Sequence, residues 1–64
     1  MKKDFREVPK EQMNAQVPVD LSTMIRERAA RRRWSITRVV TEALAVGMGI
    51  DPGTYGIDPQ EAIR

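Results

Sequence analysis

Three amide side chains at alternating positions are the residues of this chain best suited to specific hydrogen bonding. They are Gln12, Asn14 and Gln16, and they alternate with the apolar Met13, Ala15 and Val17. A carboxamide presents one donor and one acceptor group in a single plane. Because successive side chains of a strand point to opposite faces, this alternation predicts a strand over residues 12–17 with an amide face and an apolar face.

The predicted strand needs a partner from outside the chain. No other segment of the sequence alternates in this way. A lone strand leaves its backbone donors and acceptors unpaired, which costs free energy. We therefore expect residues 12–17 to pair with another chain.

Two helices are expected after the strand. Pro18 marks the end of the strand, because proline cannot donate to a central ladder. Apolar residues at helical spacing predict a first helix over residues 20–32 and a second over 36–48, with Ser35 as the N-cap of the second. The first helix starts either with Asp20 as its N-cap or with Pro18 in its first turn and Asp20 complementing the helix dipole.

The second helix is apolar over too wide an arc for one partner helix to cover. Val39, Ala43 and Val46 lie on one side of it, and Ile36, Val40 and Leu44 lie on the other. A symmetry mate would supply the missing cover. The expected dimer core consists of apolar side chains from the strand and both helices, namely Met13, Ala15, Val17, Leu21, Met24, Ile25, Ile36, Val39, Val40 and Leu44.

Composition excludes several classes of protein. The 64 residues allow one small domain, in the size range where oligomerisation commonly adds stability. With no cysteine and no histidine, disulfides and the usual zinc sites are excluded, and neither a metal nor a cofactor is expected. No glycine-rich phosphate loop or catalytic pair of acids is present, so we do not expect an enzyme. No apolar run reaches the roughly 20 residues that span a bilayer, which favours a soluble, cytoplasmic protein.

Positive charge is concentrated in the middle of the sequence. Residues 26–38 carry six arginines against Glu27, whereas residues 1–25 are balanced and residues 39–64 are net acidic. Such a block suits a phosphate-rich partner, although a solvated helix face has the same composition. The flanks are expected to be a flexible arm over residues 1–11 and a turn-rich tail over 49–64, with one helical turn at 61–64.

This order of elements resembles the ribbon-helix-helix family of DNA-binding proteins, of the MetJ and Arc type. The resemblance covers residues 12–48 and implies an α+β, mostly α, intertwined homodimer. In that family, two chains pair their strands into an antiparallel two-stranded ribbon that enters the major groove of double-stranded DNA. The implied function is that of a sequence-specific transcriptional regulator, a repressor.

The resemblance also assigns roles to particular residues. Gln12, Asn14 and Gln16 would face the bases, where a carboxamide matches N7 and the N6 amino group of adenine. The start of the second helix would hold a DNA phosphate through Ser35, Ile36, Thr37 and Arg38. The family often has glycine before this serine, whereas this chain has Arg33 and Trp34, so the turn can differ in its construction. We expect Trp34 to pack at the turn and not to stack on bases.

Two other functions are compatible with the sequence. The chain could be an antitoxin with the same DNA-binding fold, whose tail folds onto a toxin, although 16 residues after Met48 are few for wrapping a partner. It could also be a helical dimerisation module that binds only protein, in which case the arginine block would be ordinary surface.

Higher-order assembly of dimers on DNA is typical of the ribbon-helix-helix family.

Overall fold

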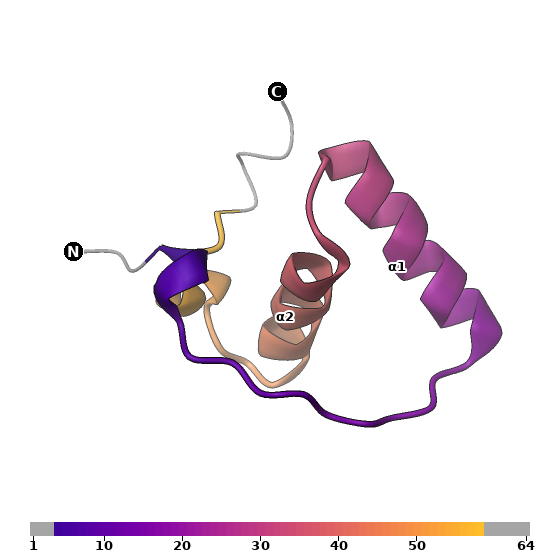
Figure 1. Cartoon of the computed structure of the whole chain (residues 1–64), viewed down its shortest axis with the longest axis horizontal. Helices are drawn as coiled ribbons and strands as arrows, with labels where there is room; N and C mark the ends of the chain where they lie inside the picture. The colour runs from indigo at the N-terminus through magenta and orange to yellow at the C-terminus, as the bar shows by residue number, and fades with distance from the viewer. Residues whose placement is uncertain (1–3, 59–64) are drawn as a thin grey trace.

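Two helices joined by a short turn form the body of the protein in a computed structural model, which describes residues 4–58. Helix α1 spans Val19–Arg32 and α2 spans Ile36–Gly47, and they are flanked by two short 3-10 turns, η1 (Phe5–Glu7) and η2 (Pro52–Tyr55). Both α1 and η2 pack on α2, which lies in the middle of the molecule (Figure 1). The described part of the chain is therefore a small, mostly helical domain, and it contains no strand.

The starts of the two helices follow from the residues before them. Helical conformation begins at Val19, and Pro18 occupies the cap position with φ −54° and ψ 143°. The alternative in which Asp20 is the N-cap is therefore wrong, because Asp20 already lies inside the first turn. The prediction that Ser35 caps α2 is confirmed, since its Oγ accepts a hydrogen bond of 3.2 Å from the N–H of Arg38.

Helix α1 ends in a left-handed residue that is not glycine. Arg33 has φ 58° and ψ 37°. The N–H of Arg33 donates to the carbonyl of Ala30 at 3.3 Å, and the N–H of Trp34 donates to that of Ala29 at 2.9 Å. This pair of bonds is the Schellman pattern, in which glycine is usual at the left-handed position. The turn thus has the backbone geometry that glycine favours, although an arginine adopts it.

Two turns in the tail also end with a residue in the left-handed conformation, and in both this residue is glycine. Gly49 and Gly56 both have φ 76°, and the isoleucine after each donates its N–H back into the preceding helix or turn. Asp51 then caps η2 by accepting from the N–H of Gly53 at 2.9 Å. The first copy of the repeated Gly-Ile-Asp-Pro sequence therefore ends α2 and starts η2, and Gly56 and Ile57 of the second copy end η2. Its last proline and the predicted turn at 61–64 lie outside the described residues.

The flanking segments are folded near the helices. Within the segment predicted as a flexible arm, Asp4 caps η1 by accepting from the N–H of Arg6 at 3.1 Å; the first three residues of that segment lie outside the described range. In the tail, Ile57 is only 1% exposed and η2 packs on α2. The tail through Ile57 therefore covers the chain's own second helix.

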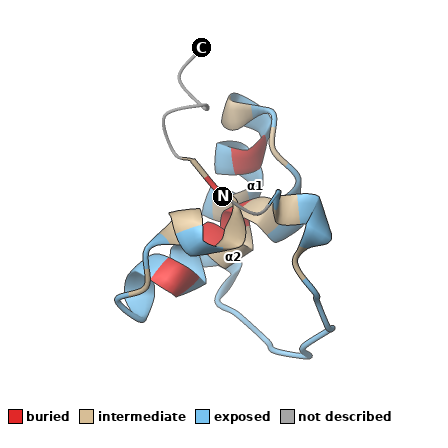
Figure 2. Ribbon diagram, turned by 90° about the vertical axis from the view of Figure 1, so that its left-hand side faces the viewer, coloured by how far each residue is buried: buried red, intermediate tan, exposed pale blue. Residues whose placement is uncertain are grey.

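The described residues enclose a very small core. Its buried apolar members are Ala29, Val39, Ala45 and Ile57. Figure 2 shows the buried residues, Glu42 included, as a few separate red segments among tan and pale blue. Large apolar side chains on both helices and on residues 12–17 stay about half exposed or more. The described chain therefore leaves many of its large apolar side chains in contact with solvent.

Candidate nucleic-acid interface

Residues 12–17 form an exposed arch between η1 and α1 (Figure 1). All six residues are exposed, including the three amides at positions 12, 14 and 16. The strand predicted here is not formed in the single chain, because a strand needs a neighbour to take its hydrogen bonds and the described residues supply none. Pairing with a second copy stays a prediction. The amide side chains are accessible to a partner along the whole arch.

Most of the expected dimer core is open to solvent. Of its ten members only Val39 is buried, at 1% exposure. Met13 is 79% exposed, and Leu44 and Met24 are each 55% exposed. The exposed residues therefore come from the arch and from both helices.

An apolar groove lies between the two helices on this face. It has a volume of about 240 Å³ and is lined by Val17, Leu21, Met24, Ile25, Arg28, Val39 and Ala43. Five of these residues belong to the predicted dimer core. The structure thus brings together the end of the arch, the first helix and the second helix around one hollow.

The start of α2 has the arrangement expected of an anion site. The Ser35 cap takes the N–H of Arg38, so it leaves the N–H groups of Ile36 and Thr37 unused. No hydrogen bond to those two N–H groups is found within residues 4–58. Ser35, Ile36 and Thr37 are all exposed. Exposed amides at the positive end of a helix dipole attract a phosphate.

Arg38 contacts an aromatic ring of its own chain. It is half-buried, and its guanidinium carbon lies 4.6 Å from the centre of the Trp34 ring. The guanidinium of Arg32 lies 4.9 Å from the same ring. Trp34 therefore receives two cations of the chain, in keeping with the expectation that it packs at the turn.

Two residues that were not predicted as site residues, Glu42 and Phe5, extend this contact at its two ends. Arg32 also bonds to Glu42, which is 6% exposed, with Nη1 2.6 Å from Oε1. The burial of Glu42 was predictable from the sequence, because Glu42 shares a helical face with the buried Val39 and Ala45, three residues away on either side. Such a placement predicts a buried acid, and a buried acid needs a partner.

At the other end, Arg38 reaches the N-terminal segment. Its guanidinium carbon lies 6.0 Å from the centre of the Phe5 ring, and Lys10 Nζ lies 4.2 Å over that ring. Lys10 also donates to the carbonyls of Phe5 and Val8 at 2.5 and 2.9 Å. Cations and aromatic rings alternate from Lys10 through Phe5, Arg38 and Trp34 to Arg32, and Glu42 ends the series as the acid bonded to Arg32. We call these six residues the cation–aromatic ladder.

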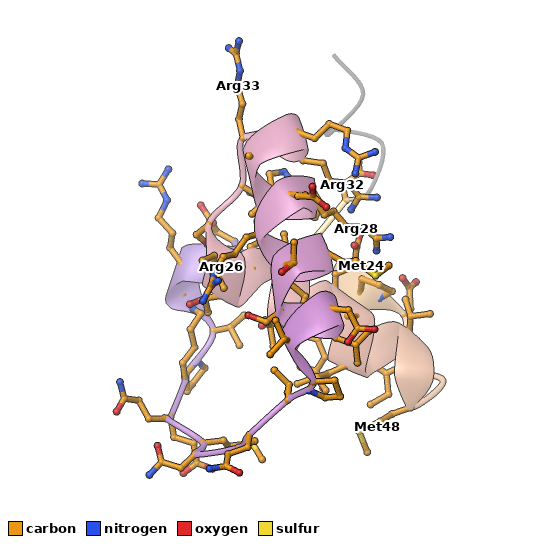
Figure 3. All side chains as sticks on the ribbon, turned by 90° about the vertical axis from the view of Figure 1, so that its right-hand side faces the viewer. Met24, Arg26, Arg28, Arg32, Arg33 and Met48 are labelled. Carbon is orange, nitrogen blue, oxygen red and sulfur yellow. The ribbon has the colours of Figure 1, made fainter. Side chains whose placement is uncertain are left out.

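The remaining arginines of the basic block do not form one patch. Arg26, Arg28, Arg31 and Arg33 are exposed. Figure 3 shows Arg28 on the same side of α1 as Met24 and Arg32, Arg26 on the other side, and Arg33 pointing away from the end of the helix. The positive charge is spread around α1, and two of the six arginines are engaged inside the ladder.

Comparisons with known proteins do not assign the chain to a family. No family model, no curated protein and no solved structure matches it. Within the described range, neither helix has the length and apolar content needed to cross a membrane.

Proposed function

We propose that the protein is a homodimeric, sequence-specific DNA-binding repressor that reads bases through a ribbon made from residues 12–17 of two chains. The observation that carries the proposal is the arch itself. It exposes three amides and carries apolar residues between them. Its backbone makes no hydrogen bonds within the described residues, so an antiparallel copy would satisfy those groups.

The exposed apolar side chains support the dimer in this proposal. A second copy would cover the groove between α1 and α2 and also the exposed Leu44 and Met13, which line a separate hollow. Burying a large apolar side chain contributes about 1.5–3 kcal/mol. Several such side chains from each copy would supply the stability that the small core of one chain lacks.

Two further features support DNA as the partner. Amide side chains without charge match the base edges of the major groove, where asparagine and glutamine bond to adenine. The capped start of α2, where the exposed residues Ile36 and Thr37 have N–H groups that the cap does not use, suits a backbone phosphate. Together they provide one surface for reading bases and one for fixing the register on the duplex.

The experiment that tests the function is a mobility shift with the DNA upstream of the protein's own gene, followed by footprinting. We expect a protected site with twofold or repeated symmetry and an affinity that falls steeply between low and moderate salt. An affinity for duplex DNA that is absent, or that does not change with salt, would instead identify a dimerisation module for protein partners.

Asn14→Ala tests the base-reading role directly. We expect a loss of about 1–3 kcal/mol in discrimination between the footprinted site and a random duplex, with unchanged helix content because Asn14 is exposed. Thr54→Ala, an exposed change in η2, is the matched control. If Asn14→Ala and the parent prefer the site equally, the arch does not read bases.

A further inference from the structure

The cation–aromatic ladder joins the two surfaces that the proposed function uses. Lys10 stands two residues before Gln12, where the arch begins, and Arg38 lies in the first turn of α2. The ammonium of Lys10 donates hydrogen bonds to two carbonyls of its own N-terminal segment. The ring of Phe5 connects that segment to Arg38. The ladder is therefore a path of contacts from the arch to the start of α2.

Both surfaces contribute to the lining of one hollow. This space of about 430 Å³ is lined by Phe5 and Gln12, from the N-terminal segment and the arch, and by Ile36 and Thr37, from the start of α2. The width of this hollow sets how far the first amide of the arch lies from the exposed N–H groups of α2. Phe5 borders the hollow and also contacts Arg38, so its ring is placed to fix that width.

We propose that Phe5, acting through Arg38 and Trp34, is a positioning residue that holds the base-reading arch at a fixed distance from the start of α2. The inference rests on the proposed function. The ring of Phe5 has no hydrogen-bonding group, and among the residues expected to meet DNA it contacts the guanidinium of Arg38. The Phe5 ring attracts the guanidinium of Arg38. The guanidinium carbon of Arg38 also lies 4.6 Å from the centre of the Trp34 ring, so two rings keep Arg38 in place. Productive binding then needs no search for the correct spacing.

The test compares Phe5→Leu, which removes the ring and keeps an apolar side chain, with Phe5→Tyr, which keeps the ring. Three measurements are made on the full chain. Side-chain NMR shifts of Arg38 report the ring contact, because aromatic rings displace the resonances of nearby protons. Circular dichroism reports helix content. Titration with the footprinted site and with a random duplex reports specificity.

We expect Phe5→Leu to move the Arg38 resonances, to leave helix content unchanged and to lower the preference for the site about two- to fivefold, as the loss of one cation–aromatic contact implies. Phe5→Tyr should match the parent in all three measurements. The inference is overturned if Phe5→Leu keeps the parent's specificity, if Phe5→Tyr loses as much as Phe5→Leu, or if helix content falls together with binding.

The outcome separates this inference from the proposed function. If the parent chain shows no preferred DNA site, the function is wrong, and the positioning role falls with it whatever the NMR shows. If the parent has a preferred site and Phe5→Leu binds it as the parent does, the function stands and only the positioning role is wrong.

Discussion

The carboxylate of Glu42 accepts a hydrogen bond of 2.6 Å from the guanidinium of Arg32, ten residues earlier in the chain. The pair joins the last turn of α1 to the middle of α2. The side chain of Glu42 is 8% exposed and that of Arg32 is 26% exposed, so the acid is desolvated while the arginine keeps some water. Arg32 also lies against Trp34, so one cation connects both helices and the turn between them.

Removing the charge of Glu42 is expected to destabilise the fold. Glu42→Gln should lower the free energy of unfolding in urea by about 1–2 kcal/mol, a range that allows for the partial exposure of Arg32. The double variant Arg32→Met with Glu42→Leu should stay within about 1 kcal/mol of the parent, because no charge is left unpaired. A double variant that is less stable than Glu42→Gln would contradict this account.

Glycine at position 33 is expected to stabilise the protein. Arg33 has φ 58°, where a side chain costs about 1–2 kcal/mol and glycine costs only its larger entropy in the unfolded chain. Arg33→Gly should therefore raise the free energy of unfolding by about 0.5–1 kcal/mol. Arg31→Gly, which removes the same charge inside α1, should lower it by about 0.5–1 kcal/mol. Equal effects of the two substitutions would count against the backbone explanation.

The cost of the Leu44→Ala substitution distinguishes a dimeric protein from a monomeric one. Leu44 is 55% exposed in the chain, so on a monomer Leu44→Ala should cost about 0.5 kcal/mol or less. If Leu44 is buried by a second copy, the cost should be about 2–5 kcal/mol. Thermal melting should then depend on protein concentration, and sedimentation equilibrium should show weaker association.

Val19→Ala is the control for this comparison. Val19 is 82% exposed and lies outside the predicted dimer core, so its substitution should change stability and association by less than about 0.5 kcal/mol. The dimer proposal fails if Leu44→Ala and Val19→Ala behave alike and the parent sediments as a monomer.

Ser35 allows the cap to be separated from the proposed phosphate contact. Ser35→Asp keeps an excellent N-cap and places a negative charge at the start of α2. Stability should be retained, whereas affinity for duplex DNA should fall more than about tenfold, because like charges in an interface cost several kcal/mol. Ser35→Ala, which loses the bond to the Arg38 N–H, should cost about 1 kcal/mol of stability. If Ser35→Asp binds duplex DNA as tightly as the parent, the proposal that a DNA phosphate binds at the start of α2 is wrong.

The helices could be predicted closely because their signals are local. The predicted range 20–32 became Val19–Arg32, and 36–48 became Ile36–Gly47. Apolar spacing defines a helical face within a few residues, and the cap at Ser35 bonds only three residues ahead. The exposed amides of residues 12–17 follow from the sequence as well, while their pairing needs a second chain.

The ladder could not be predicted in the same way. Its contacts join Phe5 to Arg38 and Arg32 to Glu42, over separations at which helical periodicity carries no information. Arg38 was assigned to a phosphate from its position in the first turn, but only the structure places its guanidinium against Trp34. Likewise, the left-handed conformation of Arg33 is set by the two bonds that close α1, although arginine does not favour it.

The sequence by itself determined which segments are helical, where the second helix is capped and which apolar residues one small chain cannot bury. Those properties depend on neighbours within about one helical turn or on the number of apolar residues. Only the tertiary structure decided that Glu42 is paired with Arg32, that Trp34 receives two arginines and that Ile57 seals the tail onto α2. The physical reason is that these contacts depend on the angle at which α2 leaves the turn, and that angle is fixed by packing between distant residues.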